Sequence, residues 1–230
     1  MREDGAMFEK MRERWTNAIH PLVVRMGDLD PSSLTWASLG LAIISFYLLS
    51  QATAGASGSA WIIGGVLLIL IAGVLDALDG ALARHQGTDG PYGDFLDHTI
   101  DRVVDVGLLV AIGMNSSFVD DPNTGLIAGL LTLFGSYMGT QAQSVGLDRI
   151  YGGFSRADRM VMTIAGLLVV SWQAYSGMSG ISMDSMHWAV QVLNLGNSEL
   201  NGMTFALAVS AWGGAYTFII RFIKTRSQLL

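Results

Sequence analysis

Long apolar stretches constrain the possible fold of this chain more than any other feature of its sequence. Several of them reach about 20 residues, the length that an α-helix needs to cross the hydrocarbon core of a bilayer. Hydrophobic residues make up 51% of the 230 residues, and the charged fraction of 14% lies well below the roughly 25% of soluble domains. The sequence therefore predicts an all-α integral membrane protein with six transmembrane helices. We expect them at about 34–53, 60–83, 93–114, 124–145, 156–175 and 203–223.

The basic residues agree with this number of spans. All 13 lysines and arginines fall in the N-terminal segment, in or beside the loops after the second and fourth spans, or at the C-terminal end. Lysine and arginine gather on the cytoplasmic side of membrane proteins. We therefore expect both termini, and any site beside the basic loops, to face the cytoplasm from the plasma membrane.

The first 30 residues differ in pattern from the rest. In residues 7–26, apolar side chains recur every three or four positions and charged ones occupy the other face, as in a helix that lies in the membrane interface. Pro31 then breaks the chain, and Ser32 and Ser33 are the candidate N-caps of the first span. The expected organisation is an interfacial amphipathic helix and linker over 1–30 and a six-helix membrane domain over 31–230.

Four aspartates surround the turn between the second and third spans. Asp76 and Asp79 are three residues apart near the end of one helix and share a face. Asp97 and Asp101 are four residues apart near the start of the next helix and also share a face. With a rise of about 1.5 Å per residue, two antiparallel helices bring both pairs to matching depths. Facing inward, the carboxylates would converge just below the cytoplasmic interface.

So many carboxylates beside lipid need neutralisation, either by protonation or by bound cations. Dense oxygen ligands suit Mg²⁺ or Mn²⁺, and there are enough of them here for two ions. Gly80 has no side chain, which lets a ligand approach the helix backbone, and Arg84 can meet a phosphate. This combination favours metal-dependent phosphoryl transfer on a membrane-embedded substrate.

A different class of protein could use the same aspartates. Carboxylates paired with Arg84 and Arg102 could line an ion or proton pathway, so a divalent-cation transporter is the alternative function. Such a pathway needs polar groups across the whole membrane. Beyond Asp105 the third span has no further acid, which favours a one-sided site. Asp105 itself is expected to pair with an arginine or with other polar groups.

The aspartates belong to a longer pattern. The spacing D-x2-D-G-x2-A-R-x8-G-x3-D-x3-D is filled by Asp76, Asp79, Gly80, Ala83, Arg84, Gly93, Asp97 and Asp101. This pattern resembles the signature of the CDP-alcohol phosphotransferase family. The resemblance implies an enzyme of phospholipid biosynthesis that transfers a phosphatidyl-type group, archaetidyl or phosphatidyl, from a CDP-linked lipid to a cytosolic alcohol and releases CMP. It also implies a homodimer in the lipid bilayer and no nucleic-acid partner.

The resemblance assigns roles to individual residues. It implies two bound divalent ions, Mg²⁺ or Mn²⁺, with the ligands Asp76, Asp79, Asp97 and Asp101. Asp101 would also be the catalytic base that takes the proton of the acceptor hydroxyl. The cytidine diphosphate would be held by Ser32, Thr35, Asp79, Gly80, Ala83, Arg84 and Gly93.

Two further segments concern the acceptor. Within the family, "FLDHTIDR" and "SRADRM" resemble segments of the archaeal and actinobacterial synthases of inositol phosphate lipids. That likeness implies that Arg156, Arg159 and Arg221 bind the phosphate of the acceptor, whereas without it the first two are ordinary cytoplasmic anchors. Relatives usually carry basic residues at the places of Gly139 and Gln141. Inositol phosphate, glycerol phosphate and an uncharged alcohol are therefore all retained as candidate acceptors.

Overall fold

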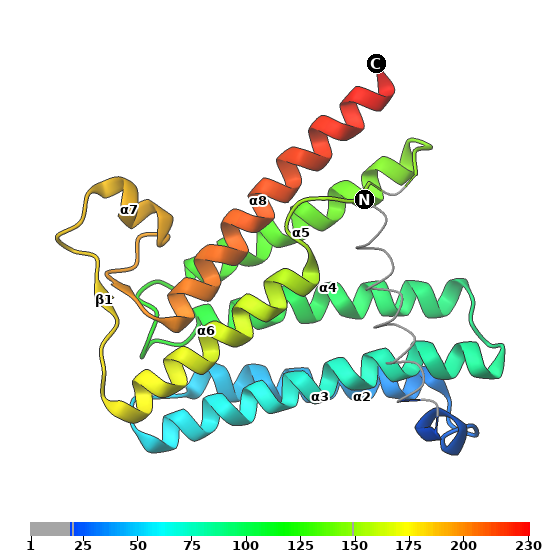
Figure 1. The fold of residues 1–230 in the computed structure, drawn as a ribbon, viewed down its shortest axis with the longest axis horizontal. Helices are drawn as coiled ribbons and strands as arrows, with labels where there is room; N and C mark the ends of the chain where they lie inside the picture. Colours follow the sequence, from blue (N-terminus) through cyan, green and yellow to red (C-terminus); the bar gives the residue numbers. More distant parts are fainter. Residues whose placement is uncertain (1–18, 20, 149) are drawn as a thin grey trace, which may run out of the picture. The chain divides into compact units, whose positions relative to one another are not determined.

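The computed structural model of the protein describes residues 19, 21–148 and 150–230. Six long helices dominate this part of the chain (Figure 1), and they are α2 (Pro31–Gln51), α3 (Ala56–Gln86), α4 (Pro91–Gly113), α5 (Asn123–Ser144), α6 (Arg156–Ser176) and α8 (Gly202–Leu229). Between α6 and α8 lie β1 (Ile181–Ser182), α7 (Trp188–Leu193) and β2 (Glu199–Leu200). The two short strands pair antiparallel, so within the described residues the fold departs from the all-α prediction only there.

The long helices coincide in position with the six predicted spans. Helices α2, α3 and α8 are long and apolar enough to cross a membrane. Helices α4 and α6 carry several charged residues near their first turns, which lowers their hydropathy. Six crossings therefore remain a prediction. The predicted interfacial helix at 7–26 falls mostly outside the described residues, although 21–25, near its end, are helical.

The chain divides into two compact units. The first unit comprises residues 1–41 and 69–101, and the second comprises 42–68 and 102–230. Helices α2, α3 and α4 each contribute residues to both units. The units are described separately below.

The first unit holds the start of α2 against the end of α3. Buried side chains of Val23, Leu34, Leu78 and Leu82 form its apolar core. The Nε2 atom of Gln86 donates hydrogen bonds to the carbonyl oxygens of residues 27 and 29, at 2.8 and 2.7 Å. The last turn of α3 therefore fixes the segment that leads into α2.

The first turn of α2 is capped differently from the prediction. The backbone N–H of Ser32 donates to Asp30 Oδ1 at 3.1 Å, and Pro31 occupies the first helical position. Proline suits that position because its missing N–H would have had no intrahelical partner. The expectation that Ser32 or Ser33 caps the helix is therefore wrong, and the cap is Asp30.

In the second unit, α5 and α6 both pack against α8. Glycines allow the close approach. A Cβ atom on Gly166 would collide with the carbonyl oxygen of Gly202, and a Cβ atom on Gly202 would collide with that of Gly166. Gly113 of α4 and Gly125 of α5 meet in the same way, since a Cβ on Gly113 would lie 2.5 Å from the Cα of Gly125. Small residues at helix crossings are typical of membrane proteins.

The loop before α6 is held by α8. The backbone N–H of Phe154 donates to Thr217 Oγ1 at 2.8 Å, and Arg221 Nε donates to the carbonyl oxygen of Gly152 at 3.3 Å. A capping box between Ser155 and Asp158 then starts α6. These contacts set the position of the first turn of α6, which carries two of the predicted acceptor-binding arginines.

Candidate active site

A cavity of about 610 Å³ lies in the first unit, and its size is typical of small-molecule sites, which measure roughly 300–1,000 Å³. It is formed by the start of α2, the last turns of α3, the connecting loop and the first turns of α4. All seven residues predicted to hold the nucleotide line it: Ser32, Thr35, Asp79, Gly80, Ala83, Arg84 and Gly93. Asp76 and Asp97 line it as well. The structure thus brings residues from three helices to one cavity.

The predicted metal ligands fall into two overlapping groups. Asp79 is buried, and the charges of Asp76 and Asp97 both act on it. Asp101 is also buried but is not among the residues that line the cavity. Asp97, His98 and Asp101 each offer a ligand atom within 4.8 Å of the others, an arrangement that could hold a metal ion. Asp97 belongs to both groups.

Thr35 has a role that the sequence did not predict. Its Oγ1 donates a hydrogen bond of 2.5 Å to Asp79 Oδ2, and both side chains are buried. The sequence predicted only a nucleotide contact for Thr35. In the structure the hydroxyl also orients a carboxylate that is predicted to bind metal.

The donor set fits a hard divalent cation. Carboxylate oxygens are the ligands that Mg²⁺ and Mn²⁺ prefer. A nearby positive charge also stabilises the ionised form most strongly where partly buried carboxylates repel one another. The residues around Asp79 therefore fit the predicted cofactor.

Arg84 lies close to Gly80 in the cavity wall. A Cβ atom on Gly80 would be 3.3 Å from Arg84 Nη1, so a larger residue there would crowd the guanidinium. Arginine offers planar, bidentate recognition of phosphate oxygens. The absence of a side chain at Gly80 thus leaves room for Arg84 in the position that it occupies.

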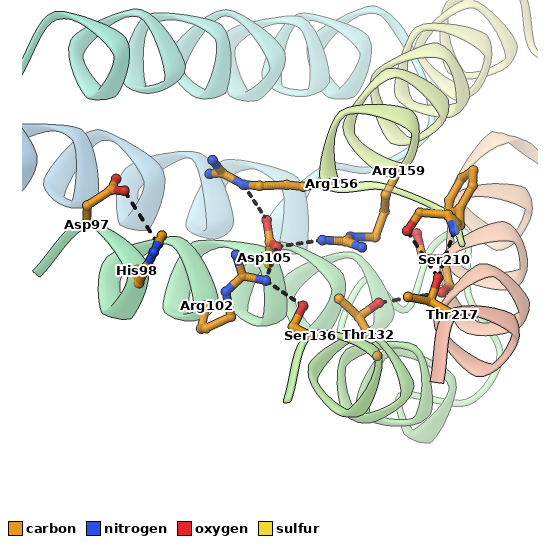
Figure 2. A network of polar contacts seen from close by, with 12 residues as sticks. Asp97, His98, Arg102, Asp105, Thr132, Ser136, Arg156, Arg159, Ser210 and Thr217 are labelled. Atoms are coloured by element: carbon orange, nitrogen blue, oxygen red, sulfur yellow. Dashed lines mark hydrogen bonds and ion pairs between the residues drawn. The ribbon is translucent and has the colours of Figure 1, made fainter. Parts of the chain in front are cut away.

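The predicted acceptor residues lie in the second unit. Arg156 and Arg159 both donate to the carboxylate of Asp105, as Figure 2 shows. The prediction that Asp105 pairs with an arginine is therefore confirmed. Arg221 donates from Nη1 to the carbonyl oxygen of Gly135 at 2.8 Å.

The guanidinium of Arg221 also lies above Gly139 of α5. A Cβ atom on Gly139 would be only 3.3 Å from Arg221 Nη1. Gly139 is one of the two places where the resemblance leads one to expect a basic residue. In this chain, α8 supplies a positive charge beside that place.

Several residues at the cavity were not predicted from the sequence. Asp30 and Tyr92 line it, and neither received a role. The Asp-Pro step at 30–31 was a usable signal for a helix cap, but nothing local indicates that it borders a cavity. His98 lies about 100° from Asp97 around an ideal helix, yet in the structure its Nδ1 is 3.6 Å from Asp97 Oδ2.

Comparisons with known proteins point to one family. The model of the CDP-alcohol phosphatidyltransferase family matches residues 29–195. The archaetidylinositol phosphate synthase of Methanothermobacter thermautotrophicus is 33% identical, over 69% of this chain and 80% of its own length. The phosphatidylinositol phosphate synthase of Cutibacterium acnes is 24% identical, over 96% of this chain and 98% of its own length.

A solved structure has a similar fold. The phosphatidylinositol phosphate synthase of Mycobacterium tuberculosis with CDP-DAG bound superposes with a TM-score of 0.67 at 21% identity, covering 92% of this chain and 94% of that one. The same protein in complex with manganese and citrate gives a TM-score of 0.65 at 21% identity, covering 92% and 89%. At this level of identity the likeness concerns the fold.

Proposed function

Because this chain belongs to the CDP-alcohol phosphatidyltransferase family, we propose that its acceptor alcohol is an inositol phosphate. The chain is a membrane enzyme of phospholipid biosynthesis that transfers a phosphatidyl-type group from a CDP-linked lipid to an alcohol and releases CMP. Both curated relatives described above are synthases of inositol phosphate lipids, which supports this acceptor over glycerol phosphate or an uncharged alcohol. The donor lipid is archaetidyl or phosphatidyl.

The cavity in the first unit is the observation that carries the proposal. The proposed donor is held there by its cytidine diphosphate, and Arg84 meets the phosphates from the cavity wall. Seven residues that the family signature and the segment before it assign to the nucleotide converge on this one cavity. Their convergence from α2, α3 and α4 supports a nucleotide site more strongly than their spacing alone.

Two divalent ions, Mg²⁺ or Mn²⁺, would be held by Asp76, Asp79, Asp97 and Asp101. When bound, such ions neutralise the pyrophosphate and the charge that develops on it during transfer. The solved relative in complex with manganese supports this assignment. Thr35 orients Asp79 for this role through the hydrogen bond described above.

Asp101 is the proposed catalytic base. It takes the proton from the acceptor hydroxyl, and the oxygen attacks the phosphorus next to the lipid. A new P–O bond forms while the bond to CMP breaks, so the lipid phosphate passes to the alcohol and CMP leaves. Asp101 is buried and is thereby shielded from bulk water.

The arginines of the second unit are the proposed site for the acceptor phosphate. Arg156 and Arg159 share Asp105, and Arg221 brings its guanidinium above Gly139. This position of Arg221 supports a phosphate-bearing acceptor even though Gly139 and Gln141 are not basic. Guanidinium groups bind a phosphate more strongly than an uncharged alcohol, because the hydrogen bonds to phosphate are charge-assisted.

We further propose that the six long helices all cross the plasma membrane, with both termini and the active site on the cytoplasmic side. The gathering of all 13 basic residues beside the same set of loops and termini supports this topology. A homodimer in the bilayer completes the proposal. The alternative of a divalent-cation transporter receives no support from the comparisons, because the matching family is one of transferases.

The direct test is an assay of CMP release by the purified protein in nanodiscs. CDP-archaeol or CDP-diacylglycerol is supplied with Mg²⁺ or Mn²⁺, and inositol 1-phosphate, glycerol 3-phosphate, inositol and serine are added singly. We expect release that depends on inositol 1-phosphate and is lost in EDTA. CMP release with another alcohol only would overturn the assignment of inositol phosphate as the acceptor. No CMP release with any of these alcohols would overturn the transferase activity itself.

Variants of the same protein test the catalytic base. Asp101→Asn is expected to abolish turnover while binding of the CDP-lipid persists, because the amide cannot accept the proton. Asp184→Asn is the matched control, since Asp184 lies exposed in the segment between α6 and α7. Near-normal turnover of Asp101→Asn would exclude Asp101 as the base.

A further inference from the structure

Asp105 stands outside the family signature, yet it is among the most deeply buried charged side chains described. It lies on α4, one helical turn after Asp101, and its side chain is 1% exposed. A buried carboxylate in a membrane protein is costly unless it is paired and hydrogen-bonded. The partners of Asp105 are therefore informative about its purpose.

Three arginines surround this carboxylate (Figure 2). Arg159 Nη2 donates to Oδ2 at 2.5 Å, and Arg156 Nε donates to Oδ1 at 3.1 Å. Arg102 Nη1 lies 3.5 Å from Oδ2 and donates to Ser136 Oγ of α5 at 2.5 Å. Asp105 thus connects side chains from α4 and α6, and Arg102 extends the network to α5.

Asp105 gathers positive charge around it. Its carboxylate lies within ion-pair distance of three guanidinium groups. Arg102 and Arg156 both repel the charge on Arg159, which is itself buried. The charge of Asp105 and its hydrogen bond to Arg159 oppose this repulsion. A phosphate monoester carries a charge of about −1.5 to −2 at neutral pH, so guanidinium groups gathered in this way would attract it.

The carboxylate also sets the direction of each guanidinium. An arginine side chain has several rotatable bonds and five N–H donors in a planar fork. Asp105 binds one edge of Arg156 through Nε and one end of Arg159 through Nη2. Arg156 contacts one oxygen of the carboxylate and Arg159 contacts the other. The two guanidinium groups are therefore fixed relative to each other. The capped first turn of α6 fixes their backbones as well.

We propose that Asp105 is a positioning residue for the acceptor: it holds Arg156 and Arg159 in the orientation in which they bind the acceptor phosphate. Asp105 does not touch the substrate or take part in the chemical step. The inference rests on the proposed function, since it presupposes that these arginines bind an inositol phosphate.

The test separates binding of the acceptor from binding of the donor. Asp105→Asn, Asp105→Glu and the control Asp184→Asn are purified as full chains in nanodiscs, and kcat and KM are measured for inositol 1-phosphate and for the CDP-lipid. For Asp105→Asn we expect KM for inositol 1-phosphate to rise about ten- to hundredfold, the change that misaligned charge-assisted hydrogen bonds produce. KM for the CDP-lipid should stay within about twofold, because the cavity residues are untouched.

The conservative variant keeps the test decisive if Asp105→Asn does not fold. Asp105→Glu retains the charge but moves the carboxylate by one methylene, so KM for inositol 1-phosphate should rise by less than in Asp105→Asn. An unchanged KM for inositol 1-phosphate in a folded variant would overturn the inference, as would an equal rise in KM for both substrates. If the wild-type protein does not use inositol 1-phosphate at all, the proposed function fails first.

Discussion

Thr35 illustrates how much a single hydroxyl can decide in this protein. It lies 44 positions before Asp79 in the chain, yet its hydrogen bond reaches that carboxylate directly. A metal ligand is usually held by a partner behind it, and loss of such a partner typically lowers metal affinity about 10- to 100-fold. The same hydroxyl borders the cavity, so a nucleotide contact and a positioning role are both open to it.

Thr35→Val separates these two roles. Valine has nearly the same shape but cannot donate, so Asp79 would lose its fixed orientation. We expect the Mn²⁺ concentration for half-maximal CMP release to rise about 10- to 100-fold, and Thr35→Ser to restore it. A raised KM for the CDP-lipid with unchanged Mn²⁺ dependence would show instead that Thr35 serves the nucleotide alone.

At the scale of helices, the crossing of α6 and α8 depends on two glycines. Gly166 and Gly202 bring the two backbones so close that neither position has room for a Cβ atom. Dispersion contacts and close backbone approach replace the hydrophobic effect as the main attraction between helices in lipid. The start of α8 and the middle of α6 are therefore joined where side chains are smallest.

Gly166→Ala should destabilise the protein. The added methyl group would push the two helices apart, and overpacking of this kind typically costs about 1–3 kcal/mol. We expect a lower midpoint of thermal unfolding in detergent. Gly64→Ala is the matched control, because a Cβ there meets only Leu48 Cδ1 at an ordinary 3.5 Å, and alanine is the better helix former. Equal midpoints for the two variants would contradict this account of the crossing.

The helices themselves could be predicted from the sequence, because long apolar runs end where glycine, proline and charged residues cluster. Their exact ends could not. Helix α3 begins at Ala56 and ends at Gln86, beyond the predicted 60–83, since hydropathy detects apolar residues and not helical ones. Helix α2 starts earlier than predicted because Asp30 caps it.

The candidate site, like the helices, could be predicted only in part. Five of the seven cavity residues belong to the signature spacing, and Ser32 and Thr35 were assigned to the nucleotide by the resemblance of the segment before the first span. The sequence therefore predicted which residues would gather. The bond from Thr35 to Asp79 and the place of Arg221 above Gly139 join distant segments, and no local pattern reports such contacts. The pairing of Asp105 with arginine followed from the cost of a buried charge, but the number of its partners did not.

For the whole molecule, the testable proposal is its topology in the membrane, with six crossings and both termini in the cytoplasm. The chain has no cysteine, so a single introduced cysteine reports on one position without interference. Four exposed serines are suitable for replacement by cysteine. Ser116 and Ser185 lie in loops without basic residues. Ser144 lies beside the basic loop after α5, and Ser227 lies in the basic C-terminal end of α8. Six crossings place these two sets on opposite sides of the bilayer.

Intact cells that express each variant can be treated with a membrane-impermeant maleimide. We expect labelling of Ser116→Cys and Ser185→Cys at once, and of Ser144→Cys and Ser227→Cys only after the membrane is opened. Permeabilised cells, in which all four should react, provide the control. Labelling of both Ser116→Cys and Ser144→Cys in intact cells would mean that α5 does not cross the bilayer.

The meeting of Gly113 with Gly125 has a consequence for the history of this sequence. Each glycine occupies the space that a side chain on the other would need, so a substitution at either one is blocked by its neighbour's backbone and not by a side chain that could shrink in return. A side chain at either position requires the two helix backbones to move apart. Among descendants of this chain, these two positions should stay constant while the exposed residues around them vary.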